Sequence, residues 1–177
     1  WVRQSTQVGR AAEAGWDEPP NTWEEFVQAA KDCTKYDDSG NITQAGYYLC
    51  WECDGWNWYR PLIEAYGGQA FSDDATQVLW DEGAAPEAWR YMVDFTLEHK
   101  TSTPGFFEGE LEAFAAGLTC MTPQLTFAVG FLRDNAAPDV EWAVTVMPEG
   151  PAGRFSTGSS WPLALTTKAT QDEAKLE

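Results

Sequence analysis

Helical and strand-like patterns alternate along the chain, and this alternation limits it to a few fold classes. Apolar residues recur at helical spacing over residues 22–35, where Thr22 and Glu25 form a capping box. Further helices are expected over residues 57–66, 86–100, 111–116 and 124–133. Strands are expected over residues 45–51, 118–122, 141–147 and 162–166, and a short hairpin over 69–71 and 78–80. Helices that alternate with single strands, without a repeat or a linker, predict one α/β unit.

Acidic residues outnumber basic residues by 28 to 11, which gives a net charge of −17. This charge opposes binding to phosphate backbones and to acidic lipid headgroups. We therefore expect no nucleic-acid partner, whereas neutral and cationic ligands are both compatible with the charge. A surface adapted for solubility would explain the same charge equally well.

Four cysteines allow three complete pairings, and the sequence does not choose among them. Cys50 and Cys53 form a lone CxxC without a second pair of ligands, so no metal site is expected. The acidic neighbours Glu52 and Asp54 disfavour a thiolate, which argues against a redox motif. Structural disulfides in an oxidising compartment and buried free thiols both stay open.

Aromatic residues are concentrated in one stretch of thirteen residues, which contains Tyr47, Tyr48, Trp51, Trp56, Trp58 and Tyr59. Flat π faces stack on the C–H face of a sugar ring, and they also attract cations. The first three residues fall on an expected strand, where core packing is the simpler explanation. Trp56 and Trp58 follow the turn at residues 54–55, so we expect them to contact a ligand.

No motif for catalysis or for cofactor binding is found. Residues 158–160 do not complete a GxSxG nucleophile elbow, no glycine-rich loop resembles a phosphate cradle, and the chain has one histidine. Paired carboxylates of the glycosidase type carry little information in a chain with 28 acidic residues. We therefore expect neither catalytic residues nor a cofactor.

Short motifs follow one another in order along the chain. Residues 14–16 and 19–26 read AGW and PPNTWEEF, residues 112–121 read EAFAAGLTCM, and residues 146–151 read VMPEGP. This series resembles the segments AG…PPxTWdEf, eaFaaGkaAM and plPxGp of the extracellular solute-binding proteins of ABC importers, particularly the sugar-binding family related to maltose-binding protein. Residues 157–161, TGSSW, fall where that family often has tGG.

The resemblance implies a two-lobed protein that closes around its ligand by a hinge motion. Residues 1–177 would form one α/β lobe of the type II periplasmic-binding-protein fold, a small mixed sheet flanked by helices, cut from a longer protein whose N-terminal lobe and final helices lie outside this segment. It also implies an extracellular or periplasmic monomer, free or lipid-anchored through a missing N-terminus, that delivers its ligand to the membrane permease of an ABC importer.

The resemblance further implies that three regions face the cleft: the start of the helix near Trp56, the turn after the strand that contains Met121, and the tGG loop. The candidate ligand-binding residues are Trp56, Trp58, Tyr59, Met121, Gln124, Gly158, Ser159 and Trp161. Aromatic stacking and hydrogen bonds to hydroxyl groups would bind a sugar or an oligosaccharide without catalysis. Ser159 replaces the second glycine of the tGG pattern.

Two other functions stay open from the residues alone. One is a binding protein for a cationic ligand such as a polyamine, which suits the acidic charge and the aromatic residues equally. The other is a fragment of a carbohydrate-active enzyme in which Glu52 or Asp54 acts together with Glu108.

Overall fold

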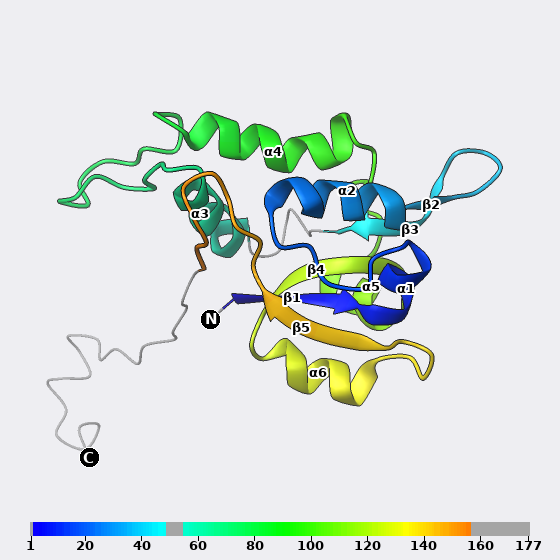
Figure 1. The fold of residues 1–177 in the computed structure, drawn as a ribbon. Coiled ribbons are helices and arrows are strands. Elements are labelled where there is room, and N and C mark those ends of the chain that lie inside the picture. Colours follow the sequence, from blue (N-terminus) through cyan, green and yellow to red (C-terminus); the bar gives the residue numbers. More distant parts are fainter. Residues whose placement is uncertain (1, 49–54, 157–177) are drawn as a thin grey trace, which may run out of the picture.

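The computed structural model describes residues 2–48 and 55–156, with the backbone alone for residues 2–8 and 55–57. A five-stranded sheet lies at its centre, in the order β2-β3-β4-β1-β5 (Figure 1). The strands are β1 (Val2–Gln7), β2 (Lys35–Tyr36), β3 (Ile42–Tyr47), β4 (Thr119–Leu125) and β5 (Trp142–Val146). β3 and β4 pair in parallel and the other neighbours pair antiparallel, so the sheet is mixed.

The described helices are α1 (Val8–Glu13), α2 (Trp23–Cys33), α3 (Gly55–Ala65), α4 (Ala85–Leu97), α5 (Glu110–Ala115) and α6 (Ala128–Asn135). Figure 1 shows α2 and α4 above the sheet and α6 below it. The larger core cluster joins α2, α3 and α4 to β3 and β4, and a second cluster joins α5 and α6 to Trp142 of β5. The predicted α/β class, a small mixed sheet flanked by helices, is confirmed.

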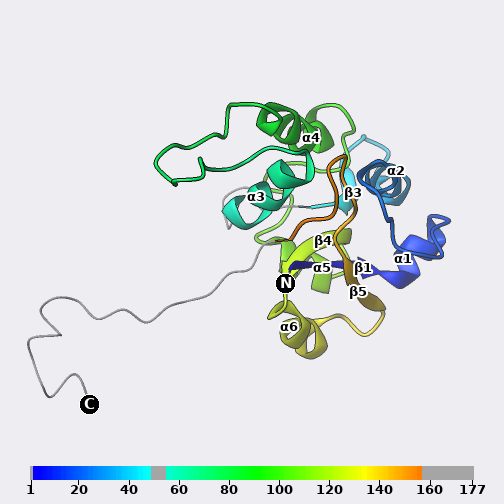
Figure 2. The same cartoon turned by 60° about the vertical axis from the view of Figure 1, so that its left-hand side comes forward.

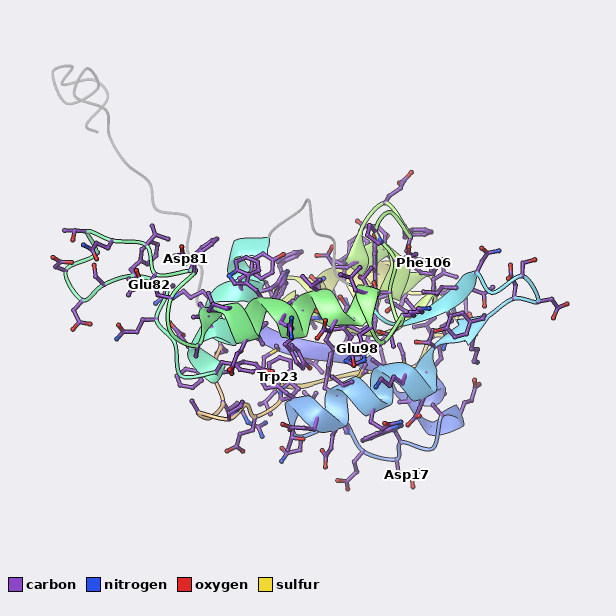
Figure 3. All side chains as sticks on the ribbon, turned by 90° about the horizontal axis from the view of Figure 1, so that it is seen from above. Asp17, Trp23, Asp81, Glu82, Glu98 and Phe106 are labelled. Atoms are coloured by element: carbon purple, nitrogen blue, oxygen red, sulfur yellow. A yellow bond between two sulfur atoms is a disulfide. The ribbon has the colours of Figure 1, made fainter. Side chains whose placement is uncertain are left out.

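The capping box at the start of α2 is confirmed. The Thr22 hydroxyl accepts a hydrogen bond from the Glu25 N–H, and the Glu25 carboxylate accepts one from the Thr22 N–H. Trp23 begins the buried face of this helix and packs edge-to-face against Tyr91 of α4, with 5.3 Å between ring centroids. Figure 3 shows Trp23 where α2 and α4 lie side by side. The capping box therefore fixes the first turn of α2 at the point where α4 covers it.

The expected boundary between the strand at 118–122 and the helix at 124–133 is wrong. β4 continues to Leu125, and α6 begins at Ala128. The strand is longer because β1 pairs antiparallel with β4 as far as Leu125. β1 carries no clear strand pattern of its own, so this long-range pairing is not visible in the local sequence. The correction places Gln124 on a strand instead of a helix.

Other expectations differ less from the structure. The strand expected over 45–51 is β3, which lies earlier in the chain, at Ile42–Tyr47. Phe71 and Val78 form an isolated antiparallel bridge at the expected hairpin. Pro61 lies beyond the first turn of α3, because this helix begins at Gly55 and not at residue 57. The strand expected over 162–166 lies outside the described residues.

A disulfide joins Cys33, the last residue of α2, to Cys120 on β4, with 6.2 Å between the Cα atoms. Both residues are fully buried. Cys33 and Cys120 therefore form a structural disulfide and are not buried free thiols. Cys50 and Cys53 lie outside the described residues. No helix in the described part of the chain is long and apolar enough to cross a membrane.

Candidate functional site

A pocket of about 460 Å³ lies where β4 ends and α5 begins. Figure 2 shows β4, α5 and α6 close together in this region, and α5 packs against both β4 and α6. The described residues that line the pocket are Glu108, Gly109, Glu110, Leu111, Glu112, Gln124 and Phe127. The pocket therefore combines an aromatic ring, an amide and three carboxylates.

Of the eight candidate ligand-binding residues, Gln124 is the one that lines this pocket in the described residues. Its side chain is 4% exposed, and its Nε2 has no hydrogen-bond partner there. A buried donor without a partner costs about 1–3 kcal/mol relative to one that is hydrogen-bonded. An oxygen atom of a bound molecule would supply the missing acceptor.

Phe127 is a site residue that the sequence analysis missed. It precedes α6 directly and is 64% exposed, although it is a large apolar side chain. The sequence analysis placed it inside a helix that it expected to begin at residue 124, and so did not consider it for the turn after β4. An exposed ring beside an unpartnered amide is an arrangement that suits a molecule with both a flat apolar face and polar edges.

Hydrogen bonds to Tyr48 hold the loop that carries Glu108. The Tyr48 hydroxyl donates to the Phe107 carbonyl oxygen at 2.7 Å and accepts from the Phe107 N–H at 3.3 Å. The Thr122 hydroxyl of β4 donates to the Tyr48 carbonyl oxygen at 3.2 Å. Because Tyr48 directly follows β3, it connects both strands to the loop before α5. The position of Glu108 beside the pocket is thus set by the parallel pair in the sheet.

Glu110 differs from the other two carboxylates of the pocket because it is buried, with 8% of its surface exposed, whereas Glu108 and Glu112 are exposed. Its charge also acts on Tyr47. Burial is the main cause that raises the pKa of the Tyr47 hydroxyl, and the charges of Tyr59 and Glu110 raise it further. Tyr47 therefore lies within electrostatic reach of both α3 and the pocket.

Two candidates on α3 are buried. Trp58 is 5% exposed and Tyr59 is 9% exposed, and both belong to the larger core cluster. Tyr59 packs against Trp89 with 4.2 Å between ring centroids, and burial raises its pKa to about 12. The Trp58 Nε1 is buried without a hydrogen-bond partner among the described residues. The structure does not bring either residue to the described lining of the pocket.

The other candidates are placed as follows. Met121 is 1% exposed and packs in the larger core cluster, and it is not among the described residues that line the pocket. Trp56 lies in the first turn of α3, where only the backbone is described. Gly158, Ser159 and Trp161 lie outside the described residues. Within residues 2–48 and 55–156, no three histidine, cysteine, aspartate or glutamate side chains are arranged to hold a metal ion.

Solved structures share this fold. A solute-binding protein from Thermotoga lettingae with bound alpha-D-tagatose has a TM-score of 0.73 and 20% identity over 86% of this chain. MalE3 of T. maritima with bound maltose has a TM-score of 0.68 and 19% identity over 87%. UgpB of Mycobacterium tuberculosis with glycerophosphocholine has a TM-score of 0.68 and 15% identity over 85%. The chain spans only 36–40% of the length of these three proteins.

No curated protein matches the chain. The family model for the bacterial extracellular solute-binding proteins matches residues 8–176. This match covers nearly all of the 177 residues and agrees with the fold shared with the solved structures. The chain therefore belongs to the family of bacterial extracellular solute-binding proteins.

Proposed function

We propose that this chain forms one lobe of the substrate-capture component of an ABC importer, and that this component binds a sugar or an oligosaccharide between two lobes. The observation that carries the proposal is the pair formed by Phe127 and Gln124: an exposed ring and an unpartnered buried amide line the same pocket. The sugars named in two of the solved structures of this fold support the proposal.

Each group of the pocket has a role in this proposal. The ring of Phe127 stacks on the C–H face of a sugar, and the Gln124 Nε2 donates a hydrogen bond to a hydroxyl oxygen. The carboxylates of Glu108 and Glu110 accept hydrogen bonds from hydroxyl groups. Trp56 then extends the aromatic wall of the cleft, and the buried rings of Trp58 and Tyr59 support α3 from the core.

The remaining candidates belong to the same proposal. Met121 supports the strand behind the pocket, and Gly158, Ser159 and Trp161 supply a further wall of the cleft. The second lobe closes over the ligand by a hinge motion. The protein acts as an extracellular or periplasmic monomer, free or held by a lipid anchor, and passes its ligand to the membrane permease of the importer.

We propose binding without catalysis, because the family is one of binding proteins. The enzymatic alternative pairs Glu108 with Glu52 or Asp54, and the latter two lie outside the described residues. Turnover of an aryl glycoside by the full-length protein, abolished by Glu108→Gln, would overturn the proposal of binding alone.

A thermal-shift screen of the full-length protein against neutral mono- and oligosaccharides tests the proposed function. We expect at least one sugar to raise the melting temperature in a concentration-dependent way, because a ligand that binds only the folded state stabilises it. The proposed function is wrong if no saccharide, neutral or charged, changes the melting temperature or the tryptophan fluorescence.

A further inference from the structure

A second pocket, of about 360 Å³, lies at the groove between α2 and α4. Figure 3 shows this groove from above, with Trp23 where the two helices lie side by side. The described lining residues come from α2, from α4 and from Tyr66, which directly follows α3. None of them lines the pocket that contains Gln124. The second pocket is therefore distinct from the proposed sugar site.

Three aromatic rings line this second pocket: Trp23, Tyr66 and Tyr91. The ring centroid of Tyr91 lies 5.3 Å from that of Trp23 and 5.9 Å from that of Tyr66, and the ring planes are inclined by 68° and 50°. The Tyr91 hydroxyl also donates a hydrogen bond to the Trp23 carbonyl oxygen at 3.1 Å. These contacts hold the rings in place before a ligand arrives, which lowers the entropic cost of binding.

Polar side chains of α2 form a stripe along the same pocket. Glu24, Gln28 and Lys31 stand at positions i, i+4 and i+7, which share one face of a helix, and all three residues are exposed. A rise of about 1.5 Å per residue places Lys31 about 10 Å from Glu24 along the helix axis. The lining therefore has a carboxylate at one end and an ammonium group at the other.

Carboxylates of α4 strengthen the negative end of the pocket. Burial is the main cause that raises the pKa of Tyr66 to about 12, and the charges of Glu24, Glu87 and Asp94 raise it further. Tyr66 thus lies in the field of three carboxylates. A positively charged group beside this ring would be attracted by the carboxylates and by the negative face of the ring. Lys31, two turns further along α2, would attract a negative group instead.

We propose that this second pocket binds a small zwitterion in which a flexible apolar chain joins an ammonium group to a carboxylate, as in an ω-amino acid. Its ammonium group pairs with Glu24 beside the ring of Tyr66, and its carboxylate pairs with Lys31. The apolar chain lies against the rings of Trp23 and Tyr91. The proposal goes beyond the proposed function and does not depend on it, because the two pockets share no described lining residue.

The test compares ligands that differ only in their charged ends. Ligand-observed NMR titrations of the full-length protein measure the affinity for 6-aminohexanoate, for hexylamine and for hexanoate, of which the last two each lack one charge. We expect 6-aminohexanoate to bind about fivefold more tightly than either, because each exposed ion pair contributes up to roughly that factor. This difference should shrink as salt is added. The shorter β-alanine, whose charges cannot reach both ends of the pocket, should bind more weakly than 6-aminohexanoate.

Variants of the two charged residues assign each end of the ligand. Glu24→Gln should weaken binding of 6-aminohexanoate about fivefold without weakening that of hexanoate, and Lys31→Gln should weaken it about fivefold without weakening that of hexylamine. Both residues are exposed, so neither variant should disturb the fold. Glu82→Gln and Lys100→Gln, at exposed residues outside the pocket lining, are the matched controls and should bind as the parent does.

The outcomes separate this inference from the proposed function. If hexylamine or hexanoate binds as tightly as 6-aminohexanoate, or if none of the three binds, the inference is wrong and the proposed function stands. If a sugar that binds the protein displaces 6-aminohexanoate, the zwitterion occupies the sugar site and the inference is again wrong. If 6-aminohexanoate binds as expected but no sugar does, the inference stands and the proposed function fails.

Discussion

Cys33 and Cys120 join the end of α2 to the strand whose other end reaches the pocket. Their disulfide closes a loop with a sequence separation of 87 residues, and both residues are buried. β4 therefore has one end fixed covalently to α2, while Gln124, near its other end, lines the pocket. This arrangement holds the strand in place beneath the site.

The disulfide should contribute strongly to stability. A crosslink that closes a loop of this length reduces the entropy of the unfolded chain, and such bonds typically contribute about 2–4 kcal/mol. We predict that replacing Cys33 and Cys120 together by alanine lowers the free energy of unfolding by this amount in denaturant titrations. Unchanged stability in the double variant, or peptide mapping that finds both thiols free in the parent protein, would contradict the prediction.

Phe127→Ala should weaken sugar binding about tenfold while changing the free energy of unfolding by less than about 0.5 kcal/mol. The ring is 64% exposed, so its removal costs little packing but removes the stacking surface. Phe71→Ala, at an exposed phenylalanine outside the pocket lining, is the control and should bind as the parent does. Equal affinity of the Phe127 variant and the parent would exclude Phe127 from the site.

Gln124→Leu should weaken ligand binding without lowering the stability of the fold. Replacing a buried donor without a partner by an apolar side chain leaves stability unchanged or raises it by about 1 kcal/mol, whereas loss of the bond to the ligand weakens binding about tenfold. Chemical denaturation measures the first effect and calorimetric titration the second. A destabilised variant with parental affinity would show that this amide serves the fold alone.

Gln44→Leu is the matched control for that experiment. Gln44 has the same exposed fraction of 4%, but its Nε2 donates to the Cys33 carbonyl oxygen at 2.7 Å and its Oε1 accepts from Arg10 at 2.8 Å. Removing these bonds should cost about 1–3 kcal/mol of stability and leave sugar affinity unchanged. We therefore expect the Gln44 variant to lose stability without losing affinity, and the Gln124 variant to lose affinity without losing stability.

Stability should fall in alkaline solution. Burial raises the pKa of Tyr59 from 10.0 to about 12, so the folded state favours the neutral phenol more than the unfolded state does. The contribution of Tyr59 is complete below pH 10.0 and is lost as the pH rises through about 12. Denaturant titrations at increasing pH measure the loss, and Tyr59→Phe should show less of it. An equal loss in the variant would assign the effect to other groups.

The parts of the fold that could be predicted are those specified locally. The Thr22–Glu25 capping box marks the start of α2, and the apolar spacing from Trp23 to Cys33 marks its buried face. β1 escaped prediction because its place depends on pairing with β4 and β5, which are distant in sequence. The disulfide pairing is likewise a property of the folded chain, since four cysteines allow three pairings.

The site was predicted only in part, because its geometry also depends on pairing between strands that are distant in sequence. Gln124 was named through the family motif, although it was expected on a helix. Phe127 was missed because the turn between β4 and α6 is set by the length of the β1–β4 pairing, which local sequence does not reveal. The carboxylates of α5 could not be told from the other acidic residues until the fold placed them around one pocket.

Calorimetric titration of the full-length protein with mono- and oligosaccharides tests the central claim most directly, with the Phe127→Ala and Gln124→Leu variants measured alongside. We predict saturable binding of one ligand per protein, weakened in both variants and unchanged in Phe71→Ala. Binding that is equally tight in all four proteins would contradict the assignment of this pocket, and the absence of binding by any sugar would contradict the proposed function itself.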